Sequence, residues 1–152
     1  MADDLSALED WAGSLLAKLN ASERRKLNQD IARELRKSQQ QRIAEQRNPD
    51  GSAYAPRKPR KNLRGKAGSL KRRKMFLKIR QAKHLKLQSS SEAIAIGFSG
   101  RSAQLARVHQ YGLRDRAARG ATDTQYAPRE LLGLTDEDLQ MIRDRLLEHL
   151  VD

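Results

Sequence analysis

Apolar residues recur at intervals of three and four in three stretches of the chain, which places them on one side of a helix. We therefore predict helices over residues 3–19 and 22–46, and a third that begins after Thr135. The apolar positions of the first helix are Leu5, Leu8, Ala12, Leu15, Leu16 and Leu19. The second has a thinner stripe of Leu27, Ile31, Leu35 and Ile43, and the third has Leu139, Ile142, Leu146 and Leu150. Trp11 lies at the margin of the first stripe, where helix packing is favoured over a role as a partner anchor.

Capping residues stand at the starts of two of these helices. Asn20 is followed three residues later by Glu23, the spacing of a capping box, although serine or threonine is the usual first residue. Thr135 is an N-cap residue, and the acidic run 136–138 after it suits the positive end of a helix dipole. Both helix starts are therefore encoded locally.

A β-hairpin is predicted over residues 84–98. Residues 84–88 alternate between polar and apolar side chains, three serines at 89–91 favour a turn, and a more apolar second strand follows. An edge strand is predicted near residues 125–128, because Pro128 cannot donate a backbone hydrogen bond inside a sheet.

Shorter elements surround the hairpin. Residues 102–111 are predicted to form a helix that ends at Gly112. Residues 71–81 fit a short basic helix, although periodicity alone does not separate helix from strand there. Residues 114–124 are polar and contain a glycine, which predicts a loop.

These elements predict an α+β fold, with a small antiparallel β-sheet flanked by helices, an N-terminal helical pair and a C-terminal helix. Turn residues after the second helix divide the chain, because Asn-Pro-Asp-Gly at 48–51 cannot continue a helix. We expect an N-terminal helical region at 1–47, a basic flexible loop at 48–69 and an α+β core with the C-terminal helix at 70–152. This is one domain with extensions.

Composition narrows the class of protein. Only 38% of residues are hydrophobic and 4% are aromatic, whereas 33% are charged, which indicates a modest core with solvated helices. No apolar run is long enough to span a membrane, and the acidic N-terminus lacks the basic region of a secretion signal. The absence of cysteine excludes disulfides, thiolate catalysis and cysteine–zinc sites.

The positive charge is concentrated in one stretch. Residues 57–86 contain 14 lysines and arginines and no acid, so the rest of the chain sums to 12 − 14 = −2. Such a stretch attracts phosphates or an acidic protein surface, and this interpretation is favoured over a basic loop that only keeps the protein solvated. The candidate contact residues are Arg57, Lys58, Arg60, Lys61, Arg64, Lys66, Lys71, Arg72, Arg73 and Lys74. Few aromatic residues interleave with them, so any nucleic-acid contact would be independent of base sequence.

Catalytic motifs are absent from the sequence. His84, His109 and His149 are far apart and form no metal-ligand pair, and no phosphate-binding glycine loop occurs. His109 could act as a base, but a structural histidine at a helix end is the favoured interpretation. We therefore expect no enzymatic activity, no cofactor and no metal site.

Four groups of residues, in this order, resemble the phage virion morphogenesis, or tail completion, family of contractile-tailed phages and prophages. They are Arg42-Ile43 with NPDG (48–51) and YAPR (54–57); Met75-Phe76 with Gly97-Phe98; ARVHQYG (106–112); and PRELLGLT (128–135). The resemblance covers about residues 5–150, and its signature residues are Pro49, Asp50, Gly51, His109, Gln110, Tyr111, Gly112, Pro128 and Arg129. Each group is weak alone, and the order makes the set specific.

The resemblance implies a structural protein that acts late in tail assembly. Its expected role is at the neck or tail end, where a ring of identical subunits, with a hexamer as one option, joins tail to head. The expected partners are neighbouring tail or neck proteins and the passing genomic DNA, with no membrane. The expected locations are the host cytoplasm during assembly and then the virion. The alternative function is sequence-independent nucleic-acid binding through residues 57–86.

Overall fold

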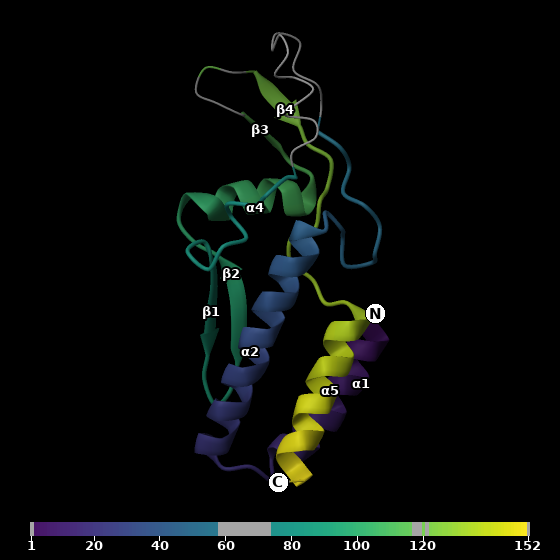
Figure 1. Cartoon of the computed structure of the whole chain (residues 1–152), viewed down its shortest axis with the longest axis vertical. Coiled ribbons are helices and arrows are strands. Elements are labelled where there is room, and N and C mark those ends of the chain that lie inside the picture. Colours follow the sequence, from purple (N-terminus) through teal and green to yellow (C-terminus); the bar gives the residue numbers. More distant parts are fainter. Residues whose placement is uncertain (1, 58–73, 117–119, 121, 152) are drawn as a thin grey trace. The chain divides into compact units, whose positions relative to one another are not determined.

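A computed structural model describes residues 2–57, 74–116, 120 and 122–151 of the chain (Figure 1). Its elements, in order, are α1 (Ala2–Leu16), α2 (Ala21–Ala44), β1 (Leu85–Ser89), β2 (Ile94–Phe98), α4 (Arg101–Tyr111), β3 (Arg114–Arg116), β4 (Asp123–Gln125) and α5 (Asp136–Val151). The strands pair as two separate two-stranded sheets, β1 with β2 and β3 with β4. The predicted α+β class is confirmed.

The chain divides into two compact units made of interleaved segments. The first unit comprises Met1–Ser38, Leu85–Gly97 and Leu134–Asp152, and the second comprises Gln39–His84 and Phe98–Gly133. Helix α2 contributes residues to both units. The expected boundaries near residues 47 and 70 stay a prediction, and most of the expected flexible loop lies outside the described residues.

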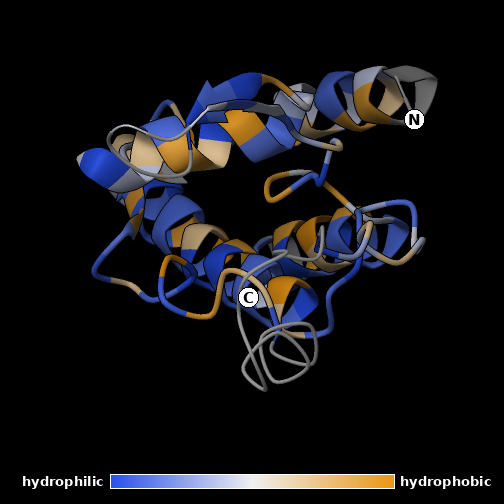
Figure 2. Cartoon of the chain, turned by 90° about the horizontal axis from the view of Figure 1, so that it is seen from above, coloured by the Kyte–Doolittle hydropathy of each residue, from blue (hydrophilic) through white to orange (hydrophobic). Residues whose placement is uncertain are grey.

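Three helices and the first hairpin build the core of the first unit. Leu27, Ile31 and Leu35 of α2 are buried with Leu146 of α5. Partly buried side chains surround them: Trp11, Ala12, Leu16, Leu19, Ile94, Ile96, Leu134, Met141 and Ile142. Figure 1 shows α1 and α5 side by side, and Figure 2 shows apolar and polar positions on each helix. Trp11 therefore packs in a helix interface, as favoured from the sequence.

Both predicted N-caps are present. The backbone N–H of Glu23 donates to Asn20 Oδ1 at 2.8 Å, and the N–H of Asn20 donates to Glu23 Oε2 at 3.4 Å. At α5 the N–H of Asp138 donates to Thr135 Oγ1, and the N–H of Thr135 donates to Asp138 Oδ2, both at 3.0 Å. The Ser38 hydroxyl also donates to Asp138, which is why this buried carboxylate is tolerated.

The predicted hairpin is confirmed as β1 and β2, and its turn is held by α2. The N–H of Ser90 donates to the carbonyl of Ala93 at 2.9 Å, and the Asn28 side-chain amide donates to the carbonyl of Ser90 at 2.7 Å. Packing of Ile94 and Ile96 against the α2 cluster supplies the apolar contact that an isolated two-stranded sheet lacks.

The predicted edge strand was misplaced. The strand is β4, at Asp123–Gln125, and it pairs antiparallel with β3 inside the segment predicted as a loop. The opposed residues are Arg114 and Gln125, Asp115 and Thr124, and Arg116 and Asp123. This ladder is polar, with an exposed ion pair of 3.2 Å between Arg116 Nε and Asp123 Oδ1, so hydrophobic alternation could not reveal it.

The predicted basic helix over 71–81 is not formed in its described part. Residues 71–73 lie outside the described part of the chain, and residues 75–80 form turns. Phe76 has a φ of 68°, a left-handed conformation that a continuing right-handed helix does not accommodate. Met75 and Ile79 are nevertheless buried with Ile43, Tyr54, Ala106 and Leu131 in the second unit's core.

None of the helices in the described ranges is long and apolar enough to cross a membrane.

Removing the α5 cap should destabilise the first unit. We expect Thr135→Ala to lower the free energy of unfolding by about 1 kcal/mol, because the N–H of Asp138 loses its acceptor. Thr135→Ser keeps the hydroxyl and serves as the control. Urea denaturation followed by circular dichroism measures both, and equal stability of Thr135→Ala and wild type would contradict the assignment.

Candidate functional site

Signature groups that are separated in sequence meet around the irregular segment 129–133 in the second unit. Arg42, in α2, is buried and only 7% exposed. Its Nη1 donates to the carbonyls of Arg47 and Glu130, each at 2.9 Å, and its Nη2 donates to the carbonyl of Leu131 at 2.8 Å and to Gln39 Oε1 at 2.6 Å. One side chain therefore joins the end of α2 to this segment.

Side-chain amides satisfy the next peptide groups of segment 129–133. Gln110 Oε1 accepts from the N–H groups of Leu131 and Leu132 at 2.8 and 2.9 Å, and Gln110 Nε2 donates to the carbonyl of Leu132 at 2.9 Å. Gln39 Nε2 donates to the carbonyl of Gly133 at 2.8 Å and its Oε1 accepts from the Gly133 N–H at 3.2 Å. These helix-borne amides supply the partners that a neighbouring strand would supply in a sheet.

A second buried arginine joins three of the signature groups. Arg129 is 4% exposed, and its Nε donates to the carbonyl of Ala55 at 2.7 Å while its Nη2 donates to the carbonyl of Pro56 at 2.9 Å. Its Nη1 lies 3.1 Å from His109 Nδ1. Since a guanidinium can only donate, Nδ1 is the acceptor and the neutral ring carries its proton on Nε2.

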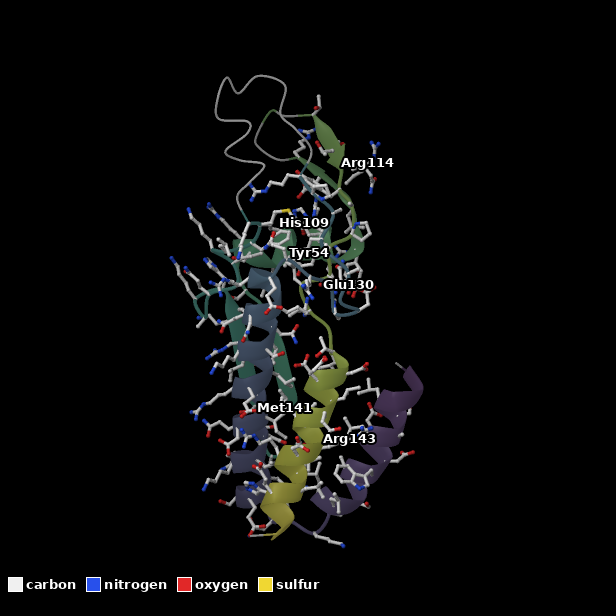
Figure 3. All side chains as sticks on the ribbon, turned by 45° about the vertical axis from the view of Figure 1, so that its right-hand side comes forward. Tyr54, His109, Arg114, Glu130, Met141 and Arg143 are labelled. Carbon is white, nitrogen blue, oxygen red and sulfur yellow. The ribbon has the colours of Figure 1, made fainter. Side chains whose placement is uncertain are left out.

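The His109 ring lies in a chain of aromatic contacts. Its centroid is 4.8 Å from that of Phe76 and 4.9 Å from that of Tyr126, both edge-on, and Phe76 contacts Tyr54 at 5.8 Å. Burial, followed by the charges of Arg129 and Arg57, lowers the pKa of His109 to about 4. His109 is thus a neutral packing residue bound to Arg129, the favoured structural interpretation, and Figure 3 shows its place near Tyr54.

The turn residues of the signature have steric and capping roles. Gly112 has a φ of 64°, and a Cβ there would lie 2.8 Å from Pro128 Cδ, so the sequence needs glycine at this C-cap. Pro49 packs directly on Gly133. Asp50 Oδ1 accepts from the N–H of Ser52 at 2.8 Å and from its hydroxyl at 2.5 Å, and these bonds, the hydroxyl first, lower the pKa of Asp50.

Tyr111 is a large signature residue that is exposed, at 69% of its surface. Asp50 and Pro128 are also exposed, so the signature contains residues that face solvent as well as buried ones. Tyr111 lies at the end of α4, directly before the Gly112 cap.

The structure leaves most of the predicted polyanion contact untested. Arg57 and Lys74 are described, and Lys74 is exposed. The other candidates, Lys58, Arg60, Lys61, Arg64, Lys66, Lys71, Arg72 and Arg73, lie outside the described residues. Contact of this stretch with a polyanion stays a prediction. Within the described ranges, no group of histidine and acidic residues could hold a metal ion.

Gln39 was missed as a member of the site, and Arg42, Asn48 and Tyr54 were noted only within the signature groups. Asn48 Oδ1 accepts from the N–H of Glu130 at 2.9 Å, and the Tyr54 hydroxyl donates to the Glu130 carbonyl at 2.9 Å. Gln39 and Arg42 lie at helical spacing between the apolar positions 35 and 43. Their polar side chains on the buried side of a helix are the feature of the sequence from which these roles could have been predicted.

Replacing the guanidinium of Arg42 should destabilise the second unit. We expect Arg42→Lys to lower the free energy of unfolding by about 3 kcal/mol, because buried carbonyls lose their donors. Arg33→Lys, at an exposed position of the same helix, should stay within about 0.5 kcal/mol of wild type. Urea denaturation measures both variants, and equal effects would contradict the assigned role of Arg42.

The neutral state of His109 predicts a pH dependence. Its pKa in the folded protein is about 4, against an ordinary value of 6.5, so the unfolded chain binds more protons between these values. This contribution, about 3 kcal/mol, is complete above pH 6.5 and is lost as the pH falls toward 4. His109→Gln, which retains an acceptor for Arg129, should show a shallower decline than wild type in denaturation at stepped pH. Parallel declines in the stability of the wild type and His109→Gln would contradict the neutral state assigned to His109.

Comparison with known proteins covers nearly the whole chain. The chain is 39% identical over 149 residues to the tail completion protein S of Escherichia phage P2, and this match spans 97% of the chain and 98% of that relative. No solved structure matches. The profile of the phage virion morphogenesis family matches residues 3–151, a range that includes the buried hydrogen-bonded residues described above. The chain therefore belongs to the phage virion morphogenesis family and has a part in building a phage virion.

Proposed function

We propose that this chain is a tail completion protein, a structural subunit that finishes the phage tail and prepares it to join the head. The observation that carries this proposal is the end-to-end match to a relative of that name, with 98% of the relative covered. A match of this extent includes both compact units, so no large part of the chain is left for an unrelated task.

The chemistry of the second unit supports a structural role. Its buried polar residues, Arg42, Gln110 and Arg129, bind backbone groups of the chain itself. His109 is a poor base, since its Nδ1 accepts from Arg129 and its pKa lies near 4. Buried polar residues whose hydrogen bonds are made within the chain stabilise its fold. We infer that the protein acts by presenting surfaces and has no enzymatic activity.

We further propose that the protein works as a ring of identical subunits at the end of the tail, in contact with neighbouring tail or neck proteins. Most oligomers are built from identical subunits related by symmetry, and a tail is itself a symmetric tube. The two-stranded β1–β2 hairpin supports self-association, because neither strand pairs with a third one among the described residues. Its sites would be the host cytoplasm during assembly and the virion afterwards.

Deleting the gene from its phage tests this function. We expect heads filled with DNA and separate tails with abnormal ends, counted by negative-stain electron microscopy of lysates. A plasmid copy of the wild-type gene should restore joined particles and plaques. Thr135→Ser supplied in the same way should restore them too, because it retains the α5 cap. Normal infectious particles from the deletion phage would contradict the proposal.

A further inference from the structure

The β1–β2 hairpin has two unpaired edges. The N–H of Ser90 donates to the carbonyl of Ala93 at 2.9 Å, and the N–H of Ser99 donates to the carbonyl of His84 at 3.1 Å, so the register of the two strands is fixed. In an antiparallel pair, the backbone groups of every second residue point away from the partner strand. Here they belong to residues 85, 87 and 89 of β1 and to residues 94, 96 and 98 of β2. Neither strand pairs with a third one in the described part of the chain.

The two faces of the hairpin differ in chemistry. Ile94 and Ile96 lie on the inner face, where they pack against the α2 cluster and yet remain partly exposed. On the outer face the register places Gln88 of β1 opposite Ala95 of β2, and both are exposed. A long side chain of β1 therefore lies beside a small one of β2, and a shallow hollow is lined by these two residues and the turn that joins the strands.

Strand β2 lacks the features that protect a free edge. Proteins that stay monomeric protect edge strands with charged residues, proline or bulges. Residues 93–98 read Ala-Ile-Ala-Ile-Gly-Phe, with no charge and no proline, whereas β1 contains Lys86. A two-stranded sheet is also only marginally stable by itself. The free edge of β2 is therefore suited to pairing with a further strand.

Strand β1 of a second copy fits this edge. Within the chain, β1 already pairs with β2 and sets Leu87 opposite Ile96 on the inner face. The outward-pointing groups of both strands belong to inner-face residues, so β1 of another copy can pair with the free edge of β2 in the same register. A strand of a different protein would leave the edge of β1 unpaired, whereas copies of this chain supply one edge of each kind.

We propose that β1 of one copy pairs antiparallel with the free edge of β2 of the next copy, with Leu87 opposite Ile96 and Gln88 opposite Ala95. The contact joins two different edges, so it is heterologous, and a closed ring of such contacts leaves no strand edge open. The inference deepens the proposed function, on which it rests, by naming the strands and the register through which subunits associate.

Cysteine pairs placed on separate chains test this register. The protein has no cysteine, so introduced thiols report the contact without background. In the proposed contact, residue 88 of one copy and residue 95 of the next form a non-hydrogen-bonded pair with Cα atoms about 4.5 Å apart, which a disulfide can bridge. Full-length Gln88→Cys and Ala95→Cys chains, mixed and oxidised with diamide, should give dimers that contain one chain of each. Mass spectrometry after a non-reducing gel identifies them.

Control pairs separate this contact from other pairings. Ser22→Cys lies at an exposed position of α2, so its mixture with Ala95→Cys should give only collisional dimers. Pairing of two β2 edges around Ile96 would instead join Ala95→Cys to Gly97→Cys. Preference for that pair, equal yields from all pairs, or no mixed dimer of Gln88→Cys with Ala95→Cys would overturn the proposal.

A charge on the outer face of β2 should weaken the same contact. We expect Ala95→Lys to raise the dissociation constant of self-association at least about tenfold in sedimentation velocity, because its ammonium would lie diagonally across from Lys86 of the next copy. Ala7→Lys, at an exposed position of α1, should associate like the wild type. Circular dichroism melts confirm that both variants are folded. Equal association of the two variants, or a wild type that does not associate, would contradict the contact.

Complementation of the deletion phage separates failure of this contact from failure of the proposed function. Ala7→Lys should restore plaques and Ala95→Lys should not. If the cysteine pairs gave no mixed dimer and Ala95→Lys restored plaques, the contact would be wrong and tail completion would stand. If the deletion phage formed normal infectious particles, the proposed function would fail, whatever the cross-linking result.

Discussion

The second unit depends on hydrogen bonds from helix side chains to the backbone of segment 129–133. This segment is irregular, with bends at residues 131 and 132, and partly buried, yet no strand lies beside it among the described residues. A buried peptide group without a partner costs about 1–3 kcal/mol, so the segment can pack only if side chains bind it. Arg42, Gln39 and Gln110 do so from α2 and α4. A helix end and a loop are thereby fixed to one another.

This constraint explains why the signature of the chain is polar and dispersed. Three of its four groups contribute to the same assembly. The first supplies Arg42 and the carbonyls of Ala55 and Pro56, the third supplies Gln110, and the fourth supplies Arg129 with the segment itself. The guanidiniums of Arg42 and Arg129 are buried against carbonyls and neutral side chains. The acceptors of these guanidiniums have fixed positions, so the side chain of a lysine or a glutamine could not reach all of them as the planar guanidinium does. The signature residues are therefore those that the fold of the second unit requires.

Local rules predicted the features that depend on neighbours in sequence. The helices at both ends, the caps at Asn20 and Thr135, the C-cap at Gly112 and the β1–β2 hairpin were predicted correctly. The β3–β4 ladder was not predicted, because its residues are polar and show no alternation of apolar side chains. The left-handed conformation of Phe76 was not predicted either, because a single backbone angle leaves no periodic pattern in the sequence. Of the site, the sequence suggested His109, Gln110 and Arg129, whereas the convergence on segment 129–133 needed contacts between residues up to 94 positions apart.

Hydrogen exchange of backbone amides in segment 129–133 tests this account most directly. Leu131, Leu132 and Gly133 donate to glutamine side chains, where an unstructured loop would donate to water. Exchange followed by nuclear magnetic resonance should show these three amides protected to the same degree as those in the middle of α2, and Gln110→Ala should release the first two. Exchange of all three at the rate of an exposed loop in the wild-type protein would contradict the account.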